Sequence, residues 1–236
     1  HQFRTSGDAY VSGALSDIGT KGLFTKEIEE ALLRGAIDIA VHSMKDVATQ
    51  LPEGLVIPAM LPRDDVRDVL LCQRASTIEA LPPRAVVGTS SLRRARQAAW
   101  LRPDLRIVNF RGNVQRRMAK LEAGEVDATL LAQAGLARLA VAPSYAAALD
   151  PEGFVPAVSQ GAIGLQCRHD DAATLGLLAA INHRPTWQMV QAERRMLYQL
   201  DGSCRTPIAA YTRMKGETLH LLGLMADPEG ACLSRH

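Results

Sequence analysis

The sequence predicts an α/β protein with two doubly wound lobes that share a hinge, plus a small α+β third domain. Short apolar runs typical of buried strands alternate with amphipathic stretches of helical period through most of the chain. Two proline-containing segments, 58–67 and 156–161, interrupt this alternation and indicate that the chain crosses between the lobes twice. Near the C-terminus, two strands joined by a tight turn indicate a separate small domain.

The first lobe begins with a helix at 22–33, in which apolar residues recur every three to four positions and which Gly35 ends. A short buried strand is expected at 37–41, leading into a polar loop at 42–46. This order of helix, strand and polar loop is typical of α/β proteins.

The second lobe repeats the rhythm of strand and helix three times. The expected strands are 86–88, 106–110 and 128–131, and the expected helices are 92–101, 114–122 and one that ends near Leu139. Strands that alternate with helices of this length predict a parallel, doubly wound sheet.

The chain then returns through a strand at 162–167, and the third domain combines a helix at 186–200 with strands at 208–211 and 219–224. The expected domains are 1–62 with 162–180 for lobe 1, 66–156 for lobe 2 and 184–236 for the third domain. Because the chain lacks an initiator Met and stops inside a strand-like pattern, we expect lobe 1 to lack its N-terminal part and the third domain to be truncated.

Composition excludes several classes of protein. Lys and Arg total 27 against 25 Asp and Glu, so the charge balance does not favour nucleic acid as a partner. No apolar run approaches the roughly 20 residues that a membrane helix needs, and no secretory signal is recognisable. The four cysteines are scattered without metal-ligand spacing, which predicts no metal site and a reducing compartment with free thiols.

Three polar clusters follow predicted strands, and in an open α/β sheet such strand ends face the ligand. The first is HSMKD at 42–46, whose Lys and Asp form a solvated pair if this is an ordinary loop. The second is GTSSLRR at 88–94, which places two arginines in the first turn of a helix, where cations oppose the helix dipole. An anionic ligand is therefore expected at that helix end. The third is RGN at 111–113.

The arginines of these clusters, with Arg117 and Arg138 further along, are expected to converge on one crevice. Gly112 allows a ligand to approach the backbone closely, and guanidinium groups bind carboxylates and phosphates through bidentate hydrogen bonds. Because the phosphate-binding glycine motifs are absent, a polycarboxylate ligand is favoured over a nucleotide. A solvated basic face is the ordinary alternative.

Cys204 lies in a short irregular loop that contains Gly202, Ser203 and Pro207. An isolated Cys is most often a small buried apolar residue, but a thiol in such a loop can be reached and alkylated. The other three cysteines lie in strand-like runs and are expected in the core: Cys72, Cys167 and Cys232.

Together these motifs resemble those of the porphobilinogen deaminases (hydroxymethylbilane synthases). The matching runs are KGLF at 21–24, DIAVHSMKD at 38–46, GTSSLRR at 88–94, RGNV at 111–114 and the segment around Cys204. The resemblance covers essentially the whole chain. It implies two lobes like those of periplasmic binding proteins and a small third domain that carries the cysteine.

The resemblance also implies a transferase that condenses four porphobilinogen molecules head to tail, releasing ammonia each time. The growing chain would start from a dipyrromethane cofactor linked to Cys204 by a thioether. Asp46 matches the catalytic aspartate, which would stabilise the positive charge that develops as ammonia leaves. The residues that would hold the cofactor are Ser43, Lys45, Thr89, Ser90, Ser91, Arg93, Arg94, Arg111, Gly112 and Arg117, and those that would contact the substrate are Lys21, Arg138 and Gln160.

A non-catalytic binding protein for anionic solutes would have the same two lobes and the same arginines. That alternative gives no purpose to Asp46 or to the Cys204 loop. The resemblance further implies a monomer in the cytoplasm, or in a plastid if the chain comes from a photosynthetic eukaryote. Porphobilinogen is then the partner, and neither nucleic acid nor a membrane is expected.

Overall fold

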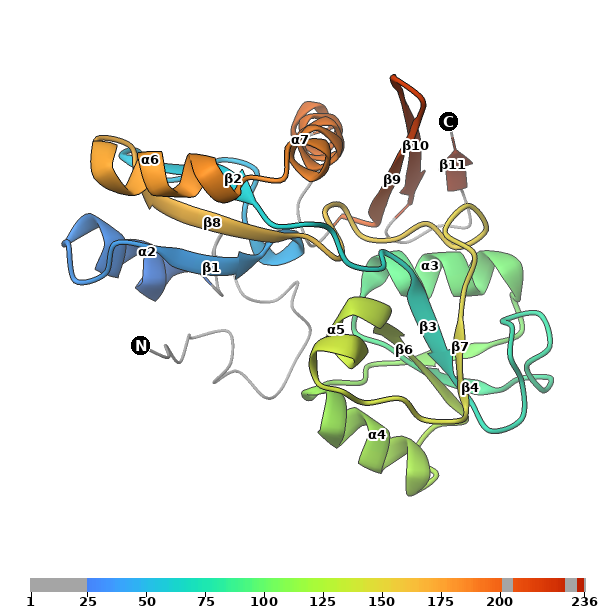
Figure 1. The fold of residues 1–236 in the computed structure, drawn as a ribbon. Coiled ribbons are helices and arrows are strands. Elements are labelled where there is room, and N and C mark those ends of the chain that lie inside the picture. Colours follow the sequence, from blue (N-terminus) through green and yellow to red (C-terminus); the bar gives the residue numbers. More distant parts are fainter. Residues whose placement is uncertain (1–24, 201–205, 228–232, 236) are drawn as a thin grey trace.

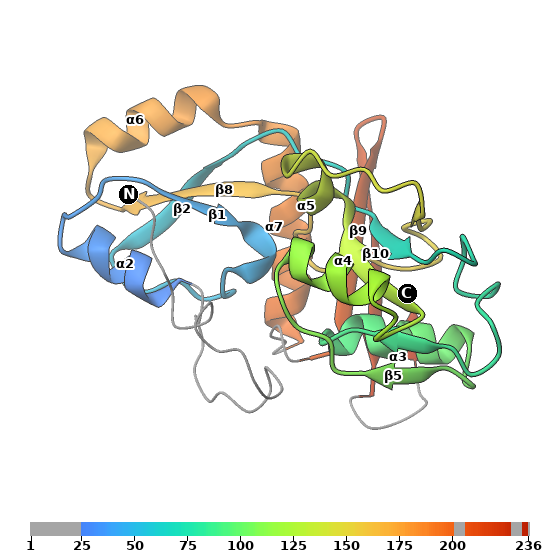
Figure 2. The same ribbon diagram turned by 90° about the horizontal axis from the view of Figure 1, so that it is seen from below.

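The computed structural model describes residues 25–200, 206–227 and 233–235 (Figure 1). Its strands form one five-stranded sheet and two three-stranded sheets. Figure 2 shows two α/β lobes side by side, with a third unit placed at their junction. The predicted fold class, two hinged α/β lobes with a small third domain, is therefore confirmed.

Lobe 1 is a three-stranded sheet with a helix on each face. Helix α2 (Lys26–Leu33) precedes strands β1 (Ala40–Ser43) and β2 (Leu55–Met60), and strand β8 (Ile163–Arg168) precedes helix α6 (Ala172–Ile181). The strand order is β1-β8-β2, and β8 runs antiparallel to both neighbours. This direction follows from the connections, because β2 leads out of lobe 1 and β8 brings the chain back. The side chains of α2 and α6 enter separate apolar clusters on the two faces of the sheet.

The sequence predicted a fully buried strand at 37–41, but the observed strand begins later and is buried on one face only. Strand β1 begins at Ala40, where pairing with Gln166 starts, and Val41 is 64% exposed. Only one face of this strand is covered, so its residues alternate between buried and exposed. The preceding loop is fixed by Arg168, whose Nη1 donates to the carbonyl of Ile37 at 2.8 Å. The strand continues to Ser43, after which Met44–Asp46 forms a 3₁₀ turn.

Lobe 2 contains the predicted alternation of strands and helices. Its elements are β3 (Asp68–Leu71), β4 (Val86–Gly88), α3 (Leu92–Leu101), β5 (Arg106–Val108), α4 (Val114–Glu122), β6 (Ala128–Ala132), α5 (Gln133–Arg138) and β7 (Ala146–Ala148). The strand order is β5-β4-β6-β3-β7. Strands β5, β4 and β6 are parallel, as expected. Strand β3 is antiparallel to both β6 and β7, so the whole sheet is mixed rather than parallel.

The third unit contains helix α7 (Arg184–Gln199) and strands β9 (Ile208–Lys215), β10 (Thr218–Ala226) and β11 (Leu233–Arg235). The strands form an antiparallel sheet of order β11-β10-β9, and α7 packs on β9. The helix and the β9–β10 hairpin were expected, although each strand is longer than the sequence indicated. The domain limits 1–62 with 162–180, 66–156 and 184–236 stay a prediction, because the sheets do not fix where each unit begins or ends.

Two expectations about the chain as a whole can be compared with the described residues. No helix in that part of the structure is long and apolar enough to cross a membrane. Within the same residues, no group of His, Cys, Asp or Glu side chains is placed to hold a metal ion. Cys72 and Cys167 are free and buried, as expected, whereas Cys232 lies outside the described residues.

Candidate functional site

The turn that contains Asp46 is held on both sides by buried residues. Met44 and Val47 belong to the apolar core of lobe 1, and the Met44 N–H donates to the carbonyl of Ala162 at 3.0 Å. The side chains of Lys45 and Asp46 lie between these two anchors and are only partly buried. The apolar residues of the motif thus fix the turn that carries its charged residues.

Helix α7 holds the same turn from the third unit. The Arg194 guanidinium donates to the carbonyls of Val47 and Ala48, the two residues that follow Asp46. Helix α7 ends at Gln199, five positions before Cys204. Cys204 and Lys21 lie outside the described residues, so their predicted roles rest on the sequence alone.

The hydroxyl groups of the 88–94 cluster have local partners. Ser91 caps helix α3, because its Oγ accepts from the Arg94 N–H at 3.4 Å. The Ser90 Oγ lies 2.7 Å from Asn109 Oδ1, and the Thr89 Oγ1 accepts from the Ser91 N–H at 3.2 Å. Donation from these hydroxyls to a ligand therefore stays a prediction, and holding the β4–α3 loop is their role within the chain.

Arg93 and Arg94 both pair with Asp68, the first residue of β3. Arg93 Nη1 lies 2.7 Å from Asp68 Oδ2, and Arg94 contacts Oδ1 through Nη2 at 2.7 Å and through Nε at 3.1 Å. Burial alone would raise the pKa of Asp68, but the two arginines hold that pKa well below its usual value. The anion that the helix dipole argument required is thus supplied by the chain itself. This corrects the reason we gave for an external ligand, and ligand binding by Arg93 and Arg94 stays a prediction.

The loop at 111–113 places a third arginine near this pair. Gly112 has a φ of 131°, which favours glycine, and its carbonyl accepts from Arg117 Nε at 2.7 Å. The pKa of Arg117 is lowered to about 10, first by burial and then by the charge of Arg94. Asn113 caps helix α4, and Arg111, the first residue of the loop, is partly buried.

Arg138 and Gln160 form contacts at the two crossings of the hinge. Arg138 Nη2 pairs with Asp64 Oδ2 at 2.6 Å and donates to the Gly161 carbonyl at 2.9 Å. Gln160 is buried, and its Nε2 donates to the Val66 carbonyl at 2.7 Å and to Asp68 Oδ1 at 3.0 Å. The expectation of a hinge near Gln160 agrees with these contacts, whereas a direct contact of either residue with substrate stays a prediction.

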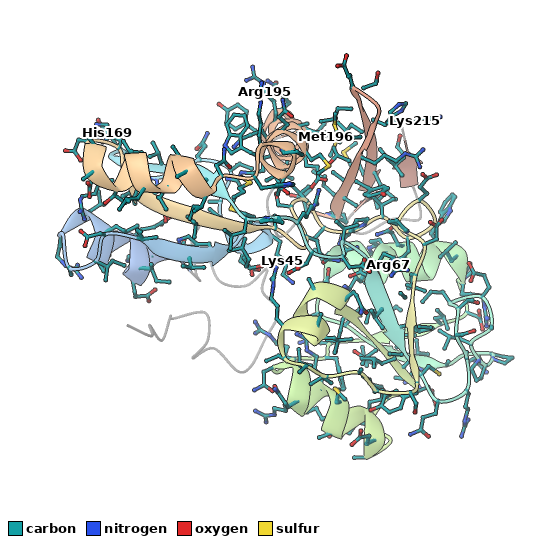
Figure 3. All side chains as sticks on the ribbon, in the orientation of Figure 1. Lys45, Arg67, His169, Arg195, Met196 and Lys215 are labelled. Atoms are coloured by element: carbon teal, nitrogen blue, oxygen red, sulfur yellow. The ribbon has the colours of Figure 1, made fainter. Side chains whose placement is uncertain are left out.

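Lys45 approaches the arginines from the opposite lobe. Figure 3 shows it where the two lobes face one another. Burial lowers the pKa of Lys45, the charges of Arg94 and Arg93 lower it further, and the charges of Asp46 and Asp68 oppose this effect. The cluster therefore has an excess of cations, Lys45, Arg93, Arg94 and Arg117 against Asp46 and Asp68. An anion that enters it would stabilise the charged forms of these side chains.

Two buried carboxylates, Asp68 in this cluster and Glu193 beside the crossings, were not singled out from the sequence. Asp68 is the first residue of strand β3, whose other residues are all apolar, and Glu193 lies on α7 three residues after the buried Val190. A charged residue beside or within a buried face is the signal that could have found them, because such a charge requires a partner. His42, within the first cluster, is instead structural, since its Nε2 lies 2.8 Å from Gln166 Oε1 and burial lowers its pKa.

Fold and site together define a hinged two-lobe α/β protein whose cluster of cations suits a ligand with several carboxylates. Comparison with protein families gives the particular class. The family model "Porphobilinogen deaminase, dipyromethane cofactor binding domain" matches residues 1–176. The model "Porphobilinogen deaminase, C-terminal domain" matches residues 187–235. The chain therefore belongs to the porphobilinogen deaminase family, whose matching domain binds a dipyrromethane cofactor.

Individual relatives agree with this assignment. The chain is 52% identical over 229 residues to the chloroplastic porphobilinogen deaminase of Oryza sativa subsp. japonica, covering 97% of this chain and 64% of the rice protein. It is 53% identical over 228 residues to porphobilinogen deaminase of Paracoccus denitrificans, covering 97% and 73%. Among solved structures it is similar to the periplasmic aliphatic sulphonate binding protein SsuA of Escherichia coli. That likeness has 19% identity, a TM-score of 0.41 and coverage of 75% and 62%, and it is too remote to indicate a ligand.

Proposed function

We propose that this chain has the porphobilinogen deaminase (hydroxymethylbilane synthase) activity of its family. Four porphobilinogen molecules are condensed head to tail. In each condensation the aminomethyl C–N bond breaks, ammonia leaves and a C–C bond forms to the free α-carbon of the growing chain, which loses a proton. Hydrolysis then releases the linear tetrapyrrole hydroxymethylbilane, so the enzyme is a transferase of tetrapyrrole biosynthesis.

The observation that carries this proposal is the cluster of buried and partly buried cations beside the Asp46 turn, drawn from both lobes. Every pyrrole of the substrate bears an acetate and a propionate, and a chain of pyrroles therefore needs several cationic partners. Lys45 and Arg117 have pKa values lowered by burial, so carboxylates that bind between the lobes recover the cost of desolvating these charges. The side chains present thus fit a dipyrromethane cofactor.

Asp46 stabilises the positive charge that develops on a pyrrole as ammonia departs, and its carboxylate accepts hydrogen bonds from pyrrole N–H groups. When bound, the dipyrromethane supplies the free α-carbon at which the chain grows, and Cys204 holds it through a thioether. The residues proposed to hold its carboxylates and polar groups are Ser43, Lys45, Thr89, Ser90, Ser91, Arg93, Arg94, Arg111, Gly112 and Arg117.

Lys21, Arg138 and Gln160 are proposed to contact the incoming porphobilinogen. For Arg138 this requires a substrate carboxylate to replace or join Asp64, its partner at the hinge. We further propose a monomer that works in the cytoplasm, or in a plastid in a photosynthetic eukaryote. A non-catalytic carrier of anionic solutes is not favoured, because the family matches and the relatives are porphobilinogen deaminases.

The proposal is tested by incubating the purified protein with porphobilinogen and measuring ammonia and linear tetrapyrrole together. We expect four molecules of ammonia for each tetrapyrrole released, with tetrapyrrole formation linear in enzyme concentration. Saturable binding of porphobilinogen without release of ammonia would contradict the proposal and support the carrier.

A further inference from the structure

The carboxylate of Asp68 contacts two arginines of helix α3 and one residue of the hinge. Its side chain has no exposed surface. Besides Arg93 and Arg94, it accepts a hydrogen bond from Gln160 Nε2 at 3.0 Å. Asp68 stands directly after the first crossing and Gln160 stands on the second, so this carboxylate ties both crossings to the beginning of helix α3.

Helix α3 needs this carboxylate. The first turn of the helix has no acidic residue of its own. Two guanidinium groups at the positive end of a helix repel one another and the dipole, so without a counter-charge neither would keep a fixed position. Arg94 donates to Asp68 Oδ1 through both Nε and Nη2, which orients its guanidinium, whereas Arg93 Nη1 forms an ion pair with the other oxygen at 2.7 Å.

The remaining contacts of the two arginines point to the same role. Arg93 Nη1 also donates to the Val155 carbonyl at 2.6 Å, and Arg94 Nη1 donates to the Leu130 carbonyl at 2.9 Å. Each guanidinium is thus held at two places by groups of the chain. The same negative charge acts on Lys45 of lobe 1, where it opposes the charges of Arg93 and Arg94.

We propose that Asp68 is a positioning residue, which aligns Arg93 and Arg94 for the carboxylates of the bound pyrrole chain and offsets their charge where lobe 1 brings Lys45 close. The part that concerns pyrroles rests on the proposed function. The alignment of the arginines by Asp68 does not.

Chemical rescue tests the alignment without any turnover. Asp68→Ala removes the carboxylate and leaves space for formate, a carboxylate of matching size. We expect the melting temperature of this variant to fall in chloride and to recover in part in formate of equal ionic strength. The matched control is Asp64→Ala, which removes a carboxylate at the same hinge whose side chain is 47% exposed and has one arginine partner. Its melting temperature should change little and respond equally to the two salts. Equal response of Asp68→Ala to formate and chloride would overturn the proposal.

Asp68→Asn, which keeps the size and removes the charge, tests the effect on the ligand and serves if Asp68→Ala does not fold. We expect the KM for porphobilinogen to rise by about ten- to a hundredfold, the effect of one lost charge-assisted hydrogen bond, with a smaller change in kcat. Intact mass should show reduced dipyrromethane occupancy.

A variant that melts lower but keeps wild-type KM and occupancy would mean that Asp68 serves only stability. If wild-type protein itself lacked the cofactor mass and activity, the proposed function would fail, and the formate result would still decide the role of Asp68.

Discussion

The Glu193 carboxylate in helix α7 forms a bidentate ion pair with the Arg63 guanidinium of the first crossing. Arg63 Nη1 lies 2.8 Å from Oε1 and Nη2 lies 2.9 Å from Oε2, and Glu193 is fully buried. The same carboxylate accepts from the Ser159 N–H on the second crossing at 2.6 Å and from the Thr212 Oγ1 in β9 at 2.6 Å. One side chain of the third unit therefore joins both crossings of the hinge.

Because of these contacts, we expect Glu193→Gln to lower the thermal stability of the protein strongly. The amide would turn an N–H₂ group toward Arg63 or Ser159, leaving a buried cation or donor without its acceptor. Breaking a buried ion pair costs about 3–5 kcal/mol, which for a chain of this size lowers the melting temperature by roughly 6–20 °C. Thermal unfolding followed by circular dichroism measures it.

Glu30→Gln is the control, because Glu30 pairs with Arg34 at 3.5 Å on the surface of α2. Exposed pairs contribute about 0–1 kcal/mol, so its melting temperature should stay near that of the wild type. Equal melting temperatures for both variants would show that Glu193 is not a structural centre.

The position of Gly161 on the second crossing is expected to require glycine. Its φ is 85°, and a Cβ there would lie 2.6 Å from the carbonyl oxygen of Asp64. Gly161→Ala must therefore shift one crossing against the other and should reduce both stability and turnover. Gly124→Ala has a similar φ of 77° with open space around it, so it should show only the backbone strain, about 1 kcal/mol. Similar losses in the two variants would argue against a tight contact between the crossings.

Asp46→Asn tests the catalytic assignment. The amide keeps the size of the side chain but loses the charge that stabilises the developing cation, which typically costs about 10²–10³ in rate. Initial rates of tetrapyrrole formation measure this, with circular dichroism to confirm an unchanged fold. Asp38→Asn is the control, since Asp38 is an exposed partner of Arg168 in the same lobe. Retention of more than about a tenth of the wild-type rate by Asp46→Asn would mean that another group is catalytic.

Arg117→Leu separates a cleft ligand from a surface charge. If Arg117 binds a pyrrole carboxylate, its loss should weaken binding by about ten- to a hundredfold and stall elongation at an intermediate length. Native mass spectra with limiting porphobilinogen should show the shortened ladder of chain lengths, and Arg93→Leu, Arg94→Leu and Arg111→Leu should each stall or fail to load the cofactor. Arg116→Leu, on the exposed side of the same helix, is expected to give a wild-type ladder. Wild-type ladders in all the variants would mean that these arginines do not serve the ligand.

Local patterns were sufficient for most of lobe 2. Strand β4 and helices α3 and α4 begin and end where the sequence indicated, because Ser91 and Asn113 cap the helices and carry a local signal. Helix α6 was not predicted, since it is apolar nearly all round and lacks the polar face that marks a surface helix.

Long-range pairing could not be read from local patterns. Asp68 is 26 residues from Arg94, and Arg63 is 130 residues from Glu193. Such pairs depend on how the two crossings lie against α3 and α7, which no periodicity encodes. The motifs therefore drew attention to Arg94, but they gave no sign of Asp68, the carboxylate with which it pairs.

The last prediction concerns the thiols. Cys204 should carry a thioether-linked dipyrromethane in protein purified from cells that make porphobilinogen, because the neighbouring Gly, Ser and Pro in the sequence predict a loop in which a thiol can be reached. Cys72 and Cys167 are buried, so a reagent reaches neither thiol easily, and burial also raises the pKa of the Cys167 thiol. Intact mass should exceed that of the unmodified chain by two pyrrole units, and peptide mapping should place this mass on the Cys204 peptide.

Two variants complete this test. Cys204→Ser should lack the added mass and all turnover, because a hydroxyl does not form the thioether. Cys72→Ser is the matched control, since it changes a buried thiol in lobe 2 and should keep both the added mass and the activity. An active preparation whose Cys204 peptide is unmodified, or whose added mass lies on another cysteine, would show that the cofactor is attached elsewhere.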